Sequence, residues 1–86
     1  MRSVRYAATF KKDFRRLPQP IRDAFRKQIE LLLRDPRHPS LDVKKMKGVG
    51  EIWRAKVTGG WRFTFQIDGV GFLLRRIGAH DILRTP

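Results

Sequence analysis

The second half of the chain is dominated by two segments in which apolar and polar residues alternate. Residues 51–58 and 61–67 both show this period of two, and Gly59-Gly60 lies between them. Such alternation is the pattern of a strand with one buried face, and a glycine pair between two strands is typical of a tight hairpin. A second turn signal, Asp68-Gly69, precedes the apolar segment Val70–Ile77, which predicts a third strand in the centre of the sheet. The fold must therefore be built on a mainly antiparallel sheet.

The first half of the chain predicts one strand and two helices. Residues 3–8 alternate as a strand, and Thr9 offers a hydroxyl for the N-cap of a following helix. That helix ends at Leu17, because the proline after it disfavours helical geometry. Pro20 suits the first turn of a second helix, which ends at Asp35-Pro36. Both helices carry an apolar stripe, formed by Phe10, Phe14 and Leu17 in the first and by Ile21, Phe25, Ile29, Leu32 and Leu33 in the second.

These elements predict a single α+β domain over residues 1–86, of order β-α-α-β-β-β with a further short strand around residues 43–46. The two apolar helix stripes require the helical hairpin to cover one face of the sheet. The strand residues expected to face the helices are Trp53, Ala55, Val57, Phe63, Phe65 and Ile67. Those expected on the opposite face are Arg54, Lys56, Arg62, Thr64 and Gln66.

The chain is strongly basic, with 20 Lys and Arg against 8 Asp and Glu and a net charge of +12. Such a surface suits nucleic acid, an acidic protein or anionic lipid. In the predicted hairpin Lys56 and Arg62 fall near each other across adjacent strands, and Arg54 lies two residues farther along on the Lys56 side. Like charges opposed across strands destabilise a sheet. Their clustering therefore indicates an anionic partner, with a merely solvated sheet face as the alternative.

Several classes of protein are disfavoured by what the sequence lacks. It contains no cysteine, which excludes disulfides and cysteine zinc sites and fits a reducing, cytoplasmic compartment. The first residues have no apolar signal-peptide segment, and no apolar run approaches the roughly 20 residues that span a bilayer. The two histidines, His38 and His80, are far apart and lack matched carboxylates. We therefore expect no metal, no other cofactor and no membrane partner.

The chain resembles the RelE superfamily of bacterial toxin–antitoxin modules along nearly its whole length. The resemblance is carried by the order and spacing of short segments: Phe10-Lys-Lys-Asp-Phe14, Leu17-Pro18, Asp35-Pro-Arg-His-Pro-Ser-Leu41, Lys45-Met-Lys-Gly48, Ile52-Trp-Arg-Ala-Lys-Val57, Trp61-Arg-Phe-Thr-Phe65 and Ile77-Gly-Ala-His-Asp81. It implies a compact toxin domain that cleaves messenger RNA in the ribosomal decoding site. It also implies a partner antitoxin, which we expect to be acidic, to bind across the basic residues and to form a hetero-oligomer with the toxin.

The resemblance also implies the residues of the site. Arg54 and Lys56 match the two basic positions of the strand before the hairpin, and Arg62 matches the arginine after an aromatic in the next strand. His80 matches the basic or imidazole position past the last strand's glycine. Arginine can clamp a phosphate through two hydrogen bonds, and histidine can act as acid or base at neutral pH. Lys56 is a candidate base, and Glu51 is a looser one.

Contacts to RNA outside this set are expected from a second group of residues. Lysines can contact phosphates, and an aromatic ring can stack on a base. The residues in question are Lys44, Lys45, Lys47 and Trp61.

One departure from the family pattern leaves alternatives open. Many ribonuclease members carry a tyrosine near the C-terminus, but Asp81–Pro86 contains none. A ParE-like inhibitor of gyrase and a non-catalytic nucleic-acid-binding module therefore remain alternatives. Retention of the four basic residues favours a metal-independent, ribosome-dependent endoribonuclease that inhibits translation.

Overall fold

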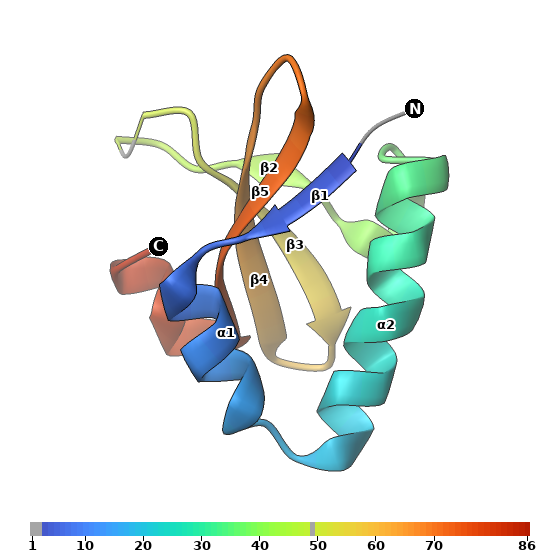
Figure 1. Cartoon of the computed structure of the whole chain (residues 1–86), viewed down its shortest axis with the longest axis vertical. Coiled ribbons are helices and arrows are strands. Elements are labelled where there is room, and N and C mark those ends of the chain that lie inside the picture. The colour runs from blue at the N-terminus through green and yellow to red at the C-terminus, as the bar shows by residue number, and fades with distance from the viewer. Residues whose placement is uncertain (1–2, 49) are drawn as a thin grey trace.

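The computed structural model describes residues 3–48 and 50–86, in which two helices cover one face of a five-stranded sheet (Figure 1). In chain order the elements are β1 (Ser3–Tyr6), α1 (Ala8–Arg15), α2 (Gln19–Arg34), the 3-10 helix η1 (Pro39–Leu41), β2 (Lys44–Lys45), β3 (Trp53–Thr58), β4 (Trp61–Ile67), β5 (Gly71–Ala79) and the 3-10 helix η2 (His80–Arg84). The strands lie in the order β1-β5-β4-β3-β2. β1 runs parallel to β5, and the other neighbours are antiparallel. The predicted fold class and element order are confirmed.

The core lies between the helices and the sheet. Its helical members are Phe10, Leu17, Phe25, Ile29 and Leu32, and its strand members include Ala55, Val57, Phe63, Phe65, Phe72, Leu74 and Ile77. Phe25 meets Phe63 edge to face, with ring centroids 5.4 Å apart. Phe63 and Phe65 are completely buried, which confirms the predicted register of β4. Ile67, at the end of β4, is 45% exposed, so the expectation that it packs under the helices is wrong.

The N-terminus of α1 differs from the prediction. The helix begins at Ala8, and its N-cap is Ala7, which provides no side-chain hydrogen bond. Thr9 therefore lies inside the first turn, and the predicted Thr9 cap is wrong. Its hydroxyl instead donates to the backbone carbonyl of Arg75 in β5, at 2.8 Å. The residue that sequence alone assigns to a local cap makes a tertiary contact.

The turn between β4 and β5 is held by Asp68. One oxygen of this carboxylate accepts the backbone N–H groups of Val70 (2.9 Å) and Gly71 (3.0 Å). Because these groups bond to the turn, β5 begins at Gly71 and not at the predicted Val70. The other oxygen pairs with Arg5 of β1, so the same side chain joins the turn to the edge strand.

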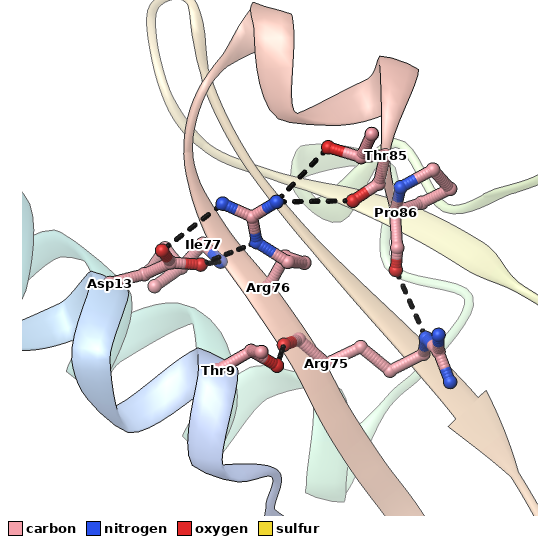
Figure 2. Close-up of polar contacts among 7 residues, drawn as sticks. All are labelled: Thr9, Asp13, Arg75, Arg76, Ile77, Thr85 and Pro86. Atoms are coloured by element: carbon pink, nitrogen blue, oxygen red, sulfur yellow. Dashed lines mark hydrogen bonds and ion pairs between the residues drawn. The ribbon is translucent and has the colours of Figure 1, made fainter.

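The outer edge of β5 is covered by α1 beyond the point where β1 ends. β5 contains a β-bulge at Arg75, where the pairing with β4 skips one residue. Thr9 bonds to the bulge carbonyl, and the carboxylate of Asp13 accepts the N–H of Ile77 at 3.2 Å (Figure 2). Two side chains of α1 thus take over the hydrogen bonds that a neighbouring strand would make.

Candidate nucleic-acid interface

The sheet face opposite the helices gathers four cations on β2, β3 and β4. Lys56 of β3 lies directly opposite Arg62 of β4. Arg54 lies two residues before Lys56 in β3. It is opposite Thr64 of β4 on one side and opposite Lys44 of β2 on the other. Directly opposed residues of an antiparallel pair point to the same face of the sheet. Lys44, Arg54, Lys56 and Arg62 therefore share one face, which we call the basic face.

The three central cations of the basic face are not neutralised. No carboxylate of the described residues lies within ion-pairing distance of Arg54, Lys56 or Arg62. All three are half-buried, so water screens their mutual repulsion less than it would at a fully exposed site. Lys44, at the margin, pairs with Asp42 at 3.6 Å. An anion placed over the centre of this face would relieve the repulsion.

The guanidinium of Arg62 is held in place by the hairpin turn. Its Nη1 donates to the backbone carbonyls of Gly59 (2.7 Å) and Trp61 (2.9 Å). Its Nε and Nη2 make no hydrogen bond to any other described residue. A fixed guanidinium with two free donors is suited to bidentate binding of a phosphate, with little further ordering required.

His80 lies at the end of the same face. Gly78 of β5 pairs with Arg62, and His80 follows two residues later as the first residue of η2. The imidazole is exposed and forms no hydrogen bond within the described part of the chain.

A glycine allows η2 to fold back over this end of the sheet. A Cβ atom at Gly78 would lie 2.7 Å from Cγ2 of Ile82 in η2, closer than side chains pack. Ile82 is buried, and it lies on the side of the sheet that carries Arg62. Thr64, in the row next to Arg62, is also completely buried, and its hydroxyl has no hydrogen-bond partner among the described residues. The basic face is thus bounded by a packed wall at the His80 end.

The segment that carries His80 is tied to the sheet by two adjacent arginines (Figure 2). Arg76 donates from Nε to Asp13 (2.7 Å) and from Nη1 to the carbonyl (3.2 Å) and hydroxyl (3.1 Å) of Thr85. Arg75 donates from Nε to the carbonyl oxygen of Pro86 at 3.0 Å. The hydrogen bonds to Asp13 raise the pKa of the Arg76 guanidinium above its usual value. We call Asp13, Arg75, Arg76, Thr85 and Pro86 the C-terminal clamp.

Three residues expected to contact RNA do not share the basic face. Lys45 lies opposite Trp53, on the other side of the sheet from Arg54, and its ammonium pairs with Glu51 at 3.2 Å. Lys47 is exposed in the loop after β2. Trp61 is half-buried against the core, because neighbouring residues of a strand point to opposite faces and Arg62 occupies the open one. The expected stacking of a base on Trp61 is therefore not supported by this placement.

The C-terminal clamp was missed by the sequence analysis, although two signals point to it. Asp13 is the one acidic residue among the first 22 residues, and it lies in a strongly basic helix. Arg75 and Arg76 form an adjacent pair of cations inside an otherwise apolar strand. Charges in such positions need partners. Their partners lie far away in sequence, so the signals indicate that a contact exists but do not identify it.

The described residues contain neither a cluster of metal ligands nor a helix that could span a membrane. No group of three or more histidine, cysteine or acidic side chains gathers there as ligands for a metal ion. None of the helices in residues 3–48 and 50–86 has the length and apolar composition needed to cross a bilayer.

The chain is similar to a curated protein and to several solved structures. No protein-family model matches the sequence. Toxin RelE3 of Methanocaldococcus jannaschii is 31% identical over 80 residues, which cover 86% of this chain and 85% of that protein. The toxin–antitoxin complex RelB–RelE from Methanococcus jannaschii contains a chain that superposes with a TM-score of 0.75 at 26% identity, over 94% of this chain and 95% of that one. YafQ from E. coli superposes with a TM-score of 0.80 at 16% identity, over 96% and 98%, which shows likeness of fold alone.

Proposed function

This chain belongs to the RelE family of toxins, and from that premise we propose that it is a metal-independent endoribonuclease that cuts messenger RNA on the ribosome. The observation that carries the proposal is the unneutralised basic face, with Arg54, Lys56 and Arg62 on neighbouring strands and His80 at its end. A phosphodiester is the anion that this arrangement of one fixed guanidinium, two further cations and one imidazole fits best.

The reaction is an internal transfer within the RNA. The 2′-oxygen loses its proton and attacks the adjacent phosphorus, and the bond from phosphorus to the 5′-oxygen breaks as that oxygen gains a proton. The products are a 2′,3′-cyclic phosphate and a 5′-hydroxyl, so no oxidant or cofactor is consumed. Arg62 holds the phosphate, and Arg54 stabilises the charge that develops on its oxygens. Lys56 accepts the proton of the 2′-hydroxyl in its neutral amine form, and His80 in its protonated form delivers a proton to the leaving oxygen.

Dependence on the ribosome is part of the proposal. The basic face holds no carboxylate that would serve as a strong base, because Glu51 pairs with Lys45 outside it. Such a site gains most from a substrate that is already held in the reactive geometry. Lys44 and Lys47 extend the positive surface beside β2 and are suited to neighbouring phosphates.

The module also needs a partner that restrains the toxin. The related RelE chain from Methanococcus jannaschii was solved as a complex with the antitoxin RelB. We infer that this chain forms a hetero-oligomer with an acidic antitoxin. The net charge of +12 favours rapid association with such a partner.

An inhibitor of gyrase is the alternative function, favoured by one observation. Asp81–Pro86 lacks the tyrosine expected of many ribonuclease members. A toxin of that kind would damage DNA and leave messages intact.

Mapping of message ends in arrested cells separates the two functions. Expression of the wild-type chain without antitoxin is expected to arrest growth and to produce new 5′-hydroxyl ends inside reading frames. Arg62→Ala is expected to relieve the arrest and remove the cuts. Lys27→Ala, which removes one exposed cation from α2, is the matched control and should behave as the wild type. Arrest with uncut messages and broken DNA would exclude the ribonuclease.

A further inference from the structure

His80 has no contact of its own that fixes its imidazole. The side chain is exposed and makes no hydrogen bond to another described residue. It is carried by η2, a 3-10 helix of five residues whose N-cap, Ala79, provides no side-chain hydrogen bond. Runs of 3-10 helix longer than about three or four residues are uncommon, because their hydrogen bonds have poor geometry. The position of the imidazole therefore depends on what holds η2 to the rest of the molecule.

One carboxylate of α1 fixes the chain just before His80. Asp13 accepts hydrogen bonds from Nε (2.7 Å) and Nη2 (3.2 Å) of Arg76 and from the backbone N–H of Ile77 (3.2 Å). The contact between Asp13 and Arg76 is bidentate, which restricts the orientation of the guanidinium as well as its distance. α1 is thereby fastened to the part of β5 from which η2 continues.

The same arginine extends the contact to the chain after His80 (Figure 2). Nη1 of Arg76 donates to the carbonyl (3.2 Å) and to the hydroxyl (3.1 Å) of Thr85. Between the two ends of this contact Ile82 is buried, and its Cγ2 lies against Gly78. η2 is thus held on both sides of His80, whereas the imidazole itself stays exposed.

We propose that Asp13 and Arg76 are positioning residues, which hold His80 where it can protonate the leaving 5′-oxygen of the RNA. Both act through η2, because Asp13 orients Arg76 and Arg76 joins the end of β5 to Thr85. A reacting group that is misplaced by about 1 Å can lose about 10²-fold in rate. This inference rests on the proposed function, because it takes His80 to be the acid. It extends the site to α1, a helix on the opposite side of the sheet from the basic face (Figure 1).

The test replaces the leaving 5′-oxygen of the message by sulfur. A thiolate leaves without a proton, because thiols ionise near about pH 8.5 and alcohols far above that value. Arg76→Gln should therefore slow cleavage of the ordinary message by about 10²-fold and cleavage of the sulfur message by less than about threefold. His80→Ala should show the same pattern, whereas Arg62→Ala should slow both messages, since each needs its phosphate held. Rates are measured in single turnovers with saturating toxin, on ribosomes that carry each message in the decoding site.

Two further variants keep the test decisive if Arg76→Gln folds poorly. Arg76→Lys keeps the charge beside Asp13 but cannot bond to Asp13 and Thr85 together, and Asp13→Asn keeps the shape of the side chain but loses its charge. Both should slow cleavage of the ordinary message alone, by at least about tenfold. Arg26→Gln, which removes the exposed ion pair with Asp23 in α2, is the matched control and should cleave both messages as the wild type does. Equal loss on both messages, or no loss on the ordinary one, would overturn the inference.

Hydrogen exchange keeps this inference apart from the proposed function. In Arg76→Gln the backbone amides of residues 82–85 should exchange at least about tenfold faster, whereas those of the β3–β4 hairpin should keep their rates. Unchanged exchange in this variant would overturn the inference even if the wild-type chain cuts messages. Equal slowing of both messages by His80→Ala would remove His80 as the acid and overturn the inference, while cleavage itself stood. A wild-type chain that cuts neither message would refute the ribonuclease, and the role of His80 with it.

Discussion

Arg62 shows how a single side chain is prepared for its ligand by the backbone around it. The backbone carbonyls of Gly59 and Trp61 hold one nitrogen of its guanidinium, and Nε and Nη2 make no hydrogen bond to another described residue. The side chain stands outside the core, so its identity bears on phosphate binding more than on folding.

The planar arrangement of donors in the Arg62 guanidinium, and not its charge alone, is expected to matter for cleavage. Arg62→Lys keeps the charge but cannot bond to the turn and to two phosphate oxygens at once. We expect a loss of about 10²–10³ in the rate of cleavage of ribosome-bound message, the size typical of removing one positioned stabiliser of developing charge. The thermal midpoint should change little. A variant that cleaves at the wild-type rate would show that charge alone is sufficient.

Asp13 is a second residue whose surroundings set its importance. Its carboxylate is 15% exposed and accepts hydrogen bonds from Arg76 and from the N–H of Ile77. Asp13→Ala leaves the N–H of Ile77 and the Nε and Nη2 of Arg76 without an acceptor, which should cost about 2 kcal/mol of unfolding free energy in urea titrations. Asp23→Ala removes the exposed ion pair with Arg26 and should cost less than about 1 kcal/mol. Equal costs would mean that the C-terminal clamp adds no stability.

At the scale of elements, the sequence predicts the parts that obey local rules. The helices and the β3–β4 hairpin follow from apolar periodicity, from prolines at helix ends and from Gly59-Gly60. Thr9 was assigned to a cap because local sequence shows only the nearest backbone, whereas its hydroxyl bonds to a strand 66 residues away. The sequence around Arg75 does not reveal the bulge. Side chains in β5 alternate between the two faces on either side of Arg75, but the alternation shifts by one residue there.

The same limit applies to the basic face. The Gly59-Gly60 turn predicts that Lys56 and Arg62 lie near each other, but their direct pairing depends on a register shift in β3, where Val57 is skipped between the pairs Thr58–Trp61 and Lys56–Arg62. Lys45 is predicted to contact RNA as a lysine near the basic strands, but a strand of only two residues is too short to show which of its side chains lie on the open face. The face on which Lys45 lies is set by the pairing of β2 with β3, which the sequence of β2 alone does not specify.

The β4–β5 turn should make stability depend on acid. Hydrogen bonds from the backbone of Val70, from Arg5 and from the backbone of Gly71 lower the pKa of Asp68. The folded state therefore binds this proton less readily than the unfolded state, whose aspartates titrate near about 3.9. The stabilisation is complete above that pH and is lost as the pH falls through the lower folded value. Asp68→Asn should flatten the fall of the thermal midpoint between pH 5 and pH 2, in about the range that these pKa values set. An unchanged acid profile would contradict this role.

The whole molecule carries its charge unevenly. The acidic residues mostly serve as local partners of basic ones, as in the pairs made by Asp13, Asp42, Glu51 and Asp68, and the centre of the basic face has none. Described cations without an ion pair also lie in α1 and α2, Lys12 and Lys27 among them, but those of the basic face share the side of the sheet that the helices leave uncovered (Figure 1).

Binding of single-stranded RNA should therefore weaken steeply with salt. Each phosphate contact contributes about −0.7 to the slope of log K against log salt concentration. Arg62→Ala should make the slope shallower by about one such contact, whereas Lys27→Ala should leave it unchanged. Anisotropy titrations of a labelled oligonucleotide at several salt concentrations measure both slopes. Affinity that does not vary with salt would show that the basic face does not bind the backbone of RNA.

The bulge at Arg75 has a consequence for how sequences of this fold can vary in length. Phe72 and Leu74 before the bulge face the helices, and so does Ile77 after it. The strand therefore contains one extra residue, and the side chains on both sides of the bulge still point to the same faces as their neighbours in the core. A chain that lacked this residue would keep the same side chains in its core. It would lose the donor to Pro86 and the carbonyl that Thr9 bonds to. Single-residue gaps in alignments are therefore expected at this point of β5, and they should accompany a C-terminal segment that is held differently.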